Sequence, residues 1–168
     1  MWIIQAKGLN MSENEGETKS TLDAFDRKIL DELATDGRMN VTELARRIGL
    51  SKSPVQARLK RLEDNGIIRG YRALLDPVRL GLDHVAFVEV RMTDTREAAL
   101  SAFNKAVLQV AEIEECYMLA ANFDYLLKIR AKDMRAYRRV LAEKISTLPY
   151  VGSTSTYVAM QAVKDSGI

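Results

Sequence analysis

The sequence predicts an α+β protein in which an N-terminal helix-turn-helix, winged-helix-like domain precedes a C-terminal ferredoxin-like βαββαβ domain. Apolar residues recur with the period of helices up to residue 83, and from His84 onward helical stretches alternate with strand-like ones. One segment of the first half also has the spacing of a helix-turn-helix. These observations define the fold class, and each element follows from a local pattern.

The first two helices are predicted from apolar stripes that end at turns. The first stripe consists of Leu22, Phe25, Ile29 and Leu33. Asp36-Gly37 ends this helix. Asn40 is a good N-cap for the second helix, with Glu43 completing a box-like start, and Gly49 ends it.

The third helix is predicted to follow directly, capped by Ser51 or Ser53. Pro54 is tolerated there because first-turn amides have no intrahelical acceptor. Its buried stripe consists of Val55, Leu59 and Leu62. Asn65-Gly66 ends the helix, and residues 67–75 are expected to form a short strand or ribbon.

The second half is predicted to contain four strands and two helices. In chain order the segments are the strand 84–92, the helix 96–110, two strands within 113–131, the helix 134–148 and the strand 150–163. The middle strands are joined at a turn around Asn122 to Asp124. Tyr137, Leu141 and Ile145 lie on one face of the last helix. This order is the split ferredoxin-like arrangement.

The domain limits follow from punctuation and composition. We expect a flexible, polar N-terminal extension at 1–20, the helix-turn-helix domain at 21–75 and a linker at 76–83, where Pro and Gly occur together. The ferredoxin-like domain then covers 84–163, and 164–168 is a C-terminal tail.

Composition excludes several classes of protein. A chain of 168 residues with 47% hydrophobic and 29% charged residues is neither disordered nor membrane-spanning. The single cysteine, Cys116, allows no internal disulfide and is typical of a cytoplasmic protein. With His84 as the only histidine, we expect no metal site, no cofactor and no catalytic residues.

Charge is distributed unevenly along the chain. Residues 38–72 contain nine Lys and Arg and three acidic residues, so this segment carries +6 while the remainder carries −4, within a total of +2. The spacing of Ala45, Gly49 and Val55 in this segment matches a helix-turn-helix: the small residue permits close crossing, the glycine turns the chain and the valine fills the angle. A basic helix-turn-helix indicates duplex DNA as the partner.

The third helix supplies the predicted recognition surface. Ser53 and Gln56 are placed to contact base edges, and Lys52 to contact a guanine or a phosphate. The other predicted DNA-binding residues are Ser51 at the start of the helix, the phosphate contacts Arg46, Arg47, Lys60 and Arg61, and the flanking clamp Arg69, Tyr71 and Arg72. Arg58 lies nearer the buried stripe, where pairing with an acid such as Glu63 or Asp31 is the alternative.

The two halves together resemble the Lrp/AsnC ("feast/famine") family of bacterial and archaeal transcription regulators. The resemblance covers residues 21–163 and rests on "LDAFDRKILDELATDGRMNVTELARRIGLSKSPVQARLKRLEDNGIIRGYRALLDPVRLGL", "FDYLLKIRA" and "TSTYVAMQAVK". The first run is specific because its Leu-Asp-x-x-Asp, Ser-x-Ser-x-Val and Gly-Ile-Ile motifs occur in order. Within the family the chain is most similar to activators of amino-acid catabolic operons, including the proline-dehydrogenase activator type.

The resemblance implies a partner, an assembly and an effector. Members of this family dimerise through the ferredoxin-like domain, and the dimers often assemble into tetramers or octamers. They bind amino acids or related molecules at clefts between dimers. The family's effector region contains a Gly-x-x-Asp turn; here Asp124 matches the acid, but Ala121 replaces the glycine. The remaining predicted effector-binding residues are Asn122, Phe123, Tyr125, Thr154 and Thr156.

Several alternatives remain open on sequence grounds. Asp124 is equally a turn-stabilising carboxylate, and the two threonines are equally residues of a strand face. A different function on the same scaffold would be a sirohaem-decarboxylase-like enzyme, although such enzymes depend on histidines and this chain has one. A winged-helix interaction module without DNA specificity is another reading. The preferred prediction is a sequence-specific regulator of amino-acid metabolism genes that acts as a homo-oligomer.

Overall fold

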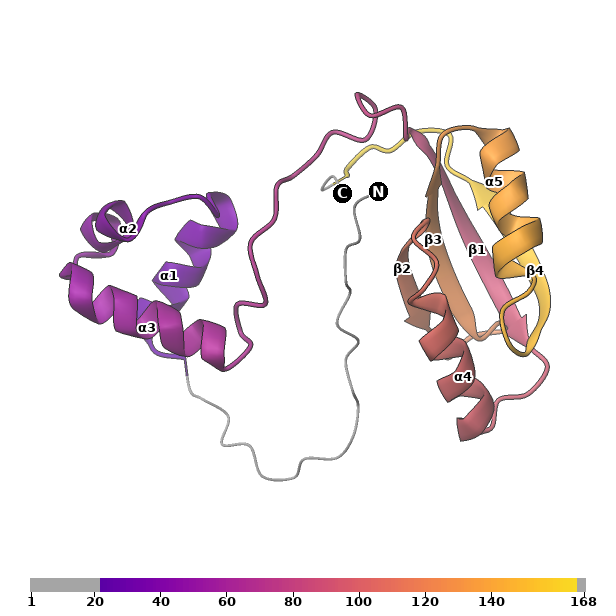
Figure 1. Cartoon of the computed structure of the whole chain (residues 1–168), viewed down its shortest axis with the longest axis horizontal. Helices are drawn as coiled ribbons and strands as arrows, with labels where there is room; N and C mark the ends of the chain where they lie inside the picture. The colour runs from indigo at the N-terminus through magenta and orange to yellow at the C-terminus, as the bar shows by residue number, and fades with distance from the viewer. Residues whose placement is uncertain (1–21, 166–168) are drawn as a thin grey trace. The chain divides into compact units, whose positions relative to one another are not determined.

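The computed structural model describes residues 22–165, which form two compact units that meet in the chain between Ala73 and Leu74 (Figure 1). The predicted extension at 1–20 lies outside the described residues, as does most of the predicted tail at 164–168. Because the units are separate bodies, each is described by itself. No helix in the described part of the chain is long and apolar enough to cross a bilayer.

The N-terminal unit is a bundle of three helices: α1 (Ala24–Thr35), α2 (Val41–Ile48) and α3 (Lys52–Asp64). Its core is made by apolar residues from all three helices. They are Ile29, Leu44, Ala45, Ile48, Val55 and Leu62, each at most 5% exposed. The predicted roles of Ala45 and Val55 as packing residues are therefore confirmed, and so are the predicted stripes except at Phe25. Phe25 is half-buried outside this core, and Arg58 lies over its ring.

The ends of these helices follow from local hydrogen bonds. Asp23 caps α1 through a reciprocal box with Asp26, and the Asn40 side chain accepts from the amide of Glu43 at the start of α2. Gly49 ends α2 with a φ of 76°, which a residue with a side chain adopts only with strain. The tight turn of the predicted helix-turn-helix is thus built as expected.

The ribbon predicted for residues 67–75 is not a strand. Its first residues complete the end of α3, where the amide of Ile68 donates to the carbonyl of Leu62 (3.0 Å), and the rest is irregular. A strand needs a neighbour to satisfy its backbone groups, and no described residue pairs with this segment. The β-branched residues supplied strand propensity without a partner, so that prediction was wrong.

The C-terminal unit has the predicted order βαββαβ. Its elements are β1 (His84–Met92), α4 (Glu97–Val107), β2 (Ile113–Met118), β3 (Tyr125–Ala131), α5 (Met134–Val140), the π-helical turn η1 (Leu141–Ile145) that continues α5, and β4 (Val151–Val158). The strands form one antiparallel sheet in the order β2-β3-β1-β4. This is the ferredoxin-like topology that the sequence predicted.

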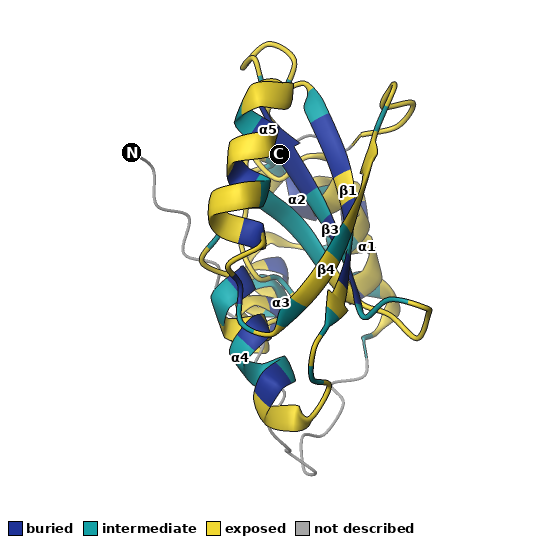
Figure 2. Ribbon diagram, turned by 90° about the vertical axis from the view of Figure 1, so that its right-hand side faces the viewer, coloured by how far each residue is buried: buried dark blue, intermediate teal, exposed yellow. Residues whose placement is uncertain are grey.

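The two faces of this sheet differ. α4 and α5 cover one face, where Val88, Leu127, Phe103, Tyr137 and further apolar side chains form a continuous core (Figure 2). Successive residues of a strand point to opposite faces, so the neighbours of these core residues form the other face. That open face carries exposed aromatic side chains, including Phe87 and Tyr157, which pair in register.

Candidate functional site

A shallow, open hollow of 410 Å³ lies on the outward face of α3, next to the start of α2. Its lining residues are Val41, Ser53, Gln56, Ala57, Leu59, Lys60 and Glu63. Ser53, Gln56 and Lys60 are exposed, whereas Val41 and Leu59 are half-buried and form an apolar floor. The structure therefore brings the two predicted base-contact residues and one predicted phosphate contact to one concave surface, which suits the polar and methyl groups of base edges.

Some predicted DNA-binding cations form no ion pair with an acid within residues 22–165. No ion pair is recorded within residues 22–165 for Lys52, Lys60, Arg69 or Arg72, and all four side chains are exposed. Ser51 occupies the N-cap position of α3, but its side chain makes no capping hydrogen bond. Such side chains are available to an external anion without breaking an existing contact.

Arg46 and Arg47 are instead paired with acids of their own unit. Glu43 accepts from Arg46 (2.7 Å) and from Arg47 (2.8 Å), and Arg47 also reaches Glu32 on α1 (2.9 Å). These hydrogen bonds lower the pKa of Glu43 to about 2. The box-like start expected of Glu43 is thus replaced by ion pairing, and phosphate contacts by the two arginines stay predictions.

A buried carboxylate holds the inward arginines of α3. Asp26 is fully buried, and its two oxygens accept from Arg58 (2.8 Å) and Arg61 (2.6 Å). Arg58 also pairs with Asp23 (2.5 Å) and lies over the ring of Phe25. Arg58 is therefore paired with acids, as the alternative proposed, but the acids are on α1 rather than Glu63 or Asp31. Arg61, a predicted phosphate contact, belongs to this cluster.

Tyr71 fastens the irregular segment after α3. Its hydroxyl donates to Glu63 (2.9 Å). Burial, and after it this hydrogen bond, raises the pKa of Tyr71 to about 12. The segment therefore has a fixed point on α3, although it forms no ribbon. Arg69 and Arg72 lie on either side of Tyr71 in the sequence and are exposed, and the clamp on DNA stays a prediction.

Asp124 has a structural role where the inner strands β1 and β3 end and begin. Its carboxylate accepts from the backbone amide of Met92 (2.7 Å), and its own amide donates to the carbonyl of Val90 (2.9 Å). These bonds lie where the pairing of β1 with β4 shifts in register, between Arg91 and Met92. Asp124 thus stabilises the structure through an amide of β1, 32 residues away, rather than through amides of its own turn. Its second oxygen makes no hydrogen bond within residues 22–165, and its role in effector binding stays a prediction.

The other predicted effector residues are spread over two environments. Ala121 and Asn122 are exposed in the loop before β3, and Phe123 is half-buried. Tyr125 is buried against Phe103 with ring centroids 4.4 Å apart.

The two threonines lie on β4. Their strand partners Val90 and Val88 are core residues, so both threonines share the helix-covered face. Thr154 is half-buried, and the hydroxyls of Thr156 and Tyr137 are hydrogen-bonded at 2.5 Å. None of the seven predicted effector residues lines the hollow on α3, and none lines the 440 Å³ cavity of the C-terminal unit beside Leu74, Asp83 and Arg130, so the effector site stays a prediction.

Sequence reasoning missed the two buried ion clusters. Asp26 occupies a position four residues after Leu22 and three before Ile29, and an acid in such an apolar stripe was the available signal. The second cluster centres on Arg130, whose guanidinium contacts Glu114, Asp165 (2.7 Å) and the carbonyl of Leu82 (3.2 Å).

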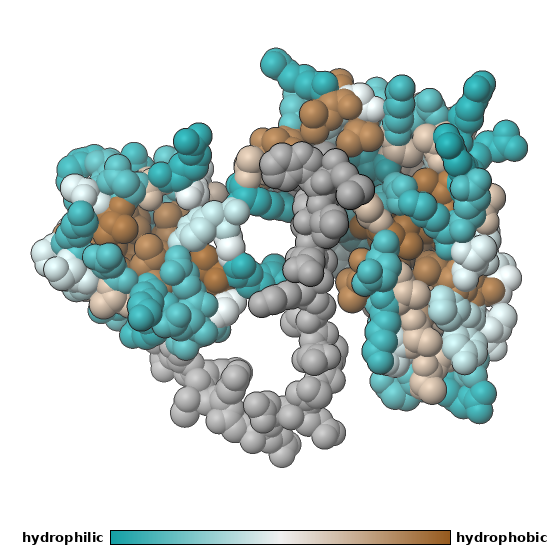
Figure 3. Space-filling model, in the orientation of Figure 1, coloured by the Kyte–Doolittle hydropathy of each residue, from teal (hydrophilic) through white to brown (hydrophobic). Residues whose placement is uncertain are grey.

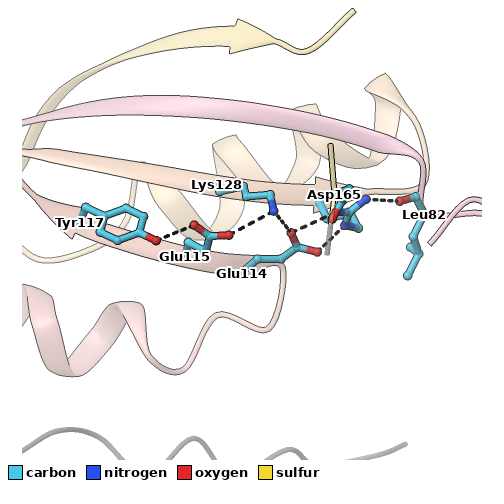
Figure 4. Close-up of polar contacts among 7 residues, drawn as sticks. Leu82, Glu114, Glu115, Tyr117, Lys128 and Asp165 are labelled. Atoms are coloured by element: carbon cyan, nitrogen blue, oxygen red, sulfur yellow. Dashed lines mark hydrogen bonds and ion pairs between the residues drawn. The ribbon is translucent and has the colours of Figure 1, made fainter. Parts of the chain in front are cut away.

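Figure 4 shows how this second cluster continues along the open face of the sheet. Lys128 donates to Glu115 (3.1 Å) and contacts Glu114 (3.2 Å), and Tyr117 donates to Glu115 (2.7 Å). The contacts join segments far apart in sequence, and no local pattern marked them.

Comparisons with known proteins agree with this geometry. Residues 22–69 match the family model for winged helix-turn-helix DNA-binding domains, and residues 85–168 match the Lrp/AsnC ligand binding domain. A proline dehydrogenase transcriptional activator of Rhizobium radiobacter is 60% identical over 88% of this chain and 94% of that relative. The leucine-responsive regulatory protein of Escherichia coli is 44% identical over 93% of this chain and 95% of the relative.

Solved structures are similar over both units. An AsnC family transcriptional regulator from Agrobacterium tumefaciens has a TM-score of 0.80 at 33% identity, covering 86% of this chain and 94% of that one. A transcriptional regulator from Neisseria meningitidis, solved as a complex with L-Met, has a TM-score of 0.79 at 34% identity, covering 87% and 94%.

A DNA-binding helix-turn-helix followed by a ligand-binding domain defines a transcriptional regulator. The relatives carry the names of regulators and activators, so the chain is a regulator and not an enzyme on this scaffold. The chain belongs to the Lrp/AsnC family, whose members self-associate and respond to amino acids. The family, the fold class and the regulatory function predicted from the sequence are confirmed.

Proposed function

We propose that the outward face of α3 enters the major groove of a pseudo-palindromic site, with Ser53 and Gln56 contacting base edges. The observation that supports this is the hollow lined by Ser53, Gln56 and Lys60, beside cations without internal partners. The inward arginines are held by Asp26, which leaves the outward side chains to the duplex. A dimer would place two such helices one helical turn of DNA, or a multiple of it, apart.

The target proposed for this chain is the promoter of a proline dehydrogenase gene in the same genome. Two relatives named as activators of that gene, at 60% and 58% identity, support the choice. The test is fluorescence anisotropy of the full chain with this promoter and with random duplex at moderate salt. We expect affinity for the promoter about 10³-fold or more above that for random duplex. Equal affinities for the two duplexes would contradict the proposal.

An amino acid, with proline tested first, is the proposed effector, bound at a cleft between dimers that includes the loop 121–124. The backbone at Ala121 has no positive φ, so its methyl group adds no strain and affects only the approach of a ligand. Because Asp124 also accepts from Met92, Asp124→Asn is a sharper test than removal of the side chain. The amide retains an acceptor but loses the charge that would pair with an ammonium group.

Isothermal titration of wild type and Asp124→Asn against the twenty amino acids tests this effector site. We expect heat with an amino acid for wild type and loss of that heat for the variant. Wild type without heat for any amino acid would remove the amino-acid hypothesis. Equal heats for both proteins would remove Asp124 from the site.

Self-association is proposed to use the open face of the sheet. Phe87, Tyr117 and Tyr157 are 37%, 53% and 54% exposed there, and exposed aromatic side chains on one face are typical of an interface. Phe87→Glu should lower the oligomeric state in sedimentation velocity, while an unchanged state would place the interface elsewhere. A DNA-binding regulator of this kind is expected in the cytoplasm.

A further inference from the structure

The C-terminal unit is electrically neutral as a whole but carries a concentrated basic segment. Residues 74–165 contain twelve Lys and Arg and twelve Asp and Glu. Four of these cations, Lys132, Arg135, Arg138 and Arg139, fall within residues 132–139, together with one acid, Asp133. The carboxylate of Asp133 is committed to capping α5, because it accepts from the amide of Ala136 (2.7 Å).

These four cations differ from most others of the unit because they form no ion pair within residues 74–165. Ion pairs hold the cations at positions 79, 96, 128, 130 and 144. Within residues 74–165 none is recorded for the four cations of the basic segment, and Arg139 does not pair with Glu143 even though it lies one turn further on.

The helix places three of the cations on one surface. At 100° per residue, Arg135, Arg138 and Arg139 lie within one sector of α5, opposite the buried Tyr137 and Val140. All three are exposed, and Figure 2 shows the outward surface of α5 in the yellow of exposed residues. Hydrophilic side chains project over α5 in Figure 3. With a rise of ~1.5 Å per residue, the three side chains start from about 6 Å of helix.

Folding does not account for this arrangement. Like charges three and four residues apart repel each other on a helix. A cation in the first turn, such as Arg135, also opposes the helix dipole. Arg138 and Arg139 lie in the last turn of α5, where the helix dipole favours cations. The mutual repulsion of the three cations remains, and binding of an anion relieves it. Guanidinium groups fit phosphate oxygens in a bidentate geometry.

We propose that the outward face of α5, formed by Arg135, Arg138 and Arg139, is a second DNA surface that binds the phosphate backbone beside the site read by α3. This inference rests on the proposed function of α3. Duplex DNA is the polyanion that the other unit of the same chain already binds. The 65–83 segment between α3 and β1 extends to at most about 60 Å, which corresponds to roughly 18 base pairs of flanking duplex.

The test compares the salt dependence of binding on short and long duplexes. One duplex contains only the site that the protein binds in the proline dehydrogenase promoter, called the selected site, and the other adds 25 base pairs on each side. The variant is Arg135→Gln/Arg138→Gln/Arg139→Gln, because glutamine keeps helix propensity. The control, Arg79→Gln/Lys105→Gln/Lys164→Gln, removes the same charge from exposed positions elsewhere on the unit.

For the α5 variant we expect a weaker salt dependence on the long duplex, where the magnitude of the negative slope of log K against log salt should decrease by about two to three. On the short duplex the slope should change little. The control should keep the wild-type difference between the two duplexes. Wild-type slopes for the α5 variant on both duplexes would overturn the proposal and leave the face to an acidic protein partner.

Two further outcomes have separate meanings. A loss of slope together with an altered oligomeric state in sedimentation velocity would assign the face to self-assembly, and would also overturn the proposal. Failure of wild type to prefer the selected site over random duplex would refute the proposed function of α3, independently of α5.

Discussion

The two units each bury one ionised group between two partners of opposite charge, but with the charges reversed. In the N-terminal unit the carboxylate of Asp26 lies between Arg58 and Arg61. In the C-terminal unit the guanidinium of Arg130 lies between Glu114 and Asp165. Removing the central group takes an ion-pair partner from two like charges in either case, although Arg58 keeps Asp23 and Glu114 keeps Lys128.

The difference between the clusters lies in what they connect. Asp26 joins α1 to α3 and so sets how the recognition helix lies on its bundle. Arg130 joins β2, the segment before β1 and the C-terminal segment, through Glu114, Leu82 and Asp165. One cluster orients a single helix for binding, whereas the other fastens chain segments to a sheet. Substitutions should therefore separate DNA affinity from stability differently in the two units.

Asp26→Ala should give the largest effect. It leaves Arg61 without its carboxylate, leaves Arg58 with Asp23 alone, and removes the acceptor of the capping box, so we expect a loss of about 2–3 kcal/mol in the free energy of unfolding. The arginines remain partly exposed, which keeps the loss below that of a fully buried pair. Urea unfolding followed by circular dichroism measures it. Asp23→Ala removes the N-cap and one of the two ion pairs of Arg58 but keeps Asp26, so it is the comparison, with an expected loss of about 1 kcal/mol. Equal losses for the two variants would show that the ion pairs of Asp26 with Arg58 and Arg61 do not stabilise the unit.

Arg130→Met should destabilise the C-terminal unit by about 2 kcal/mol, because Glu114 and Asp165 lose a charged donor in a largely buried place. Lys128 still contacts Glu114 (3.2 Å), which limits the effect. Affinity for DNA should remain close to wild type in the folded protein. A DNA-binding defect without loss of stability would contradict the distinction between the two clusters.

Gln56→Ala should cost about 1–2 kcal/mol on the selected site, roughly tenfold in affinity, and nothing on random duplex. Its side chain lies in the hollow on α3 and is exposed, so we expect its loss to change the stability of the unit little. Parallel anisotropy titrations with both duplexes give the ratio. An unchanged ratio of specific to nonspecific affinity would place the recognition face elsewhere.

Lys60→Gln and Arg47→Gln sharpen the comparison between unpaired and paired cations. Lys60 has no partner within residues 22–165, so its loss should reduce the salt slope by about one on every sequence. Arg47 must leave Glu43 and Glu32 before it binds a phosphate, so its loss should change the slope less. The reverse order would show that the pairs in the free protein do not limit DNA contacts.

The smallest effect concerns pH. Arg46 and Arg47 lower the pKa of Glu43 in the folded chain to about 2, from an ordinary value of 4.5. A depressed carboxyl pKa stabilises the fold above the unfolded value, and this contribution is lost as pH falls from 4.5 to about 2. Stability should therefore fall less over this window in Glu43→Gln than in wild type. Identical pH profiles would show that the pairs contribute nothing in solution.

The sequence predicted what depends on local pattern. The helical stripe of Ile29, the left-handed turn at Gly49 and the alternation of β1 each reflect contacts within a few residues, and the structure has all three. The ribbon at 67–75 failed because a strand depends on a partner elsewhere in the chain. The predicted partners of Arg58 were wrong for the same reason, because its actual partners Asp23 and Asp26 are more than thirty residues away in the sequence.

Methylation interference on the selected binding site tests most directly whether the outward face of α3 reads the major groove. Dimethyl sulfate modifies guanine N7 in the major groove and adenine N3 in the minor groove. We predict that N7 methylation at two positions about one helical turn apart, or a multiple of it, abolishes binding, and that N3 methylation between them does not. Interference from adenine N3 alone, or from neither base, would contradict this placement of the recognition helix.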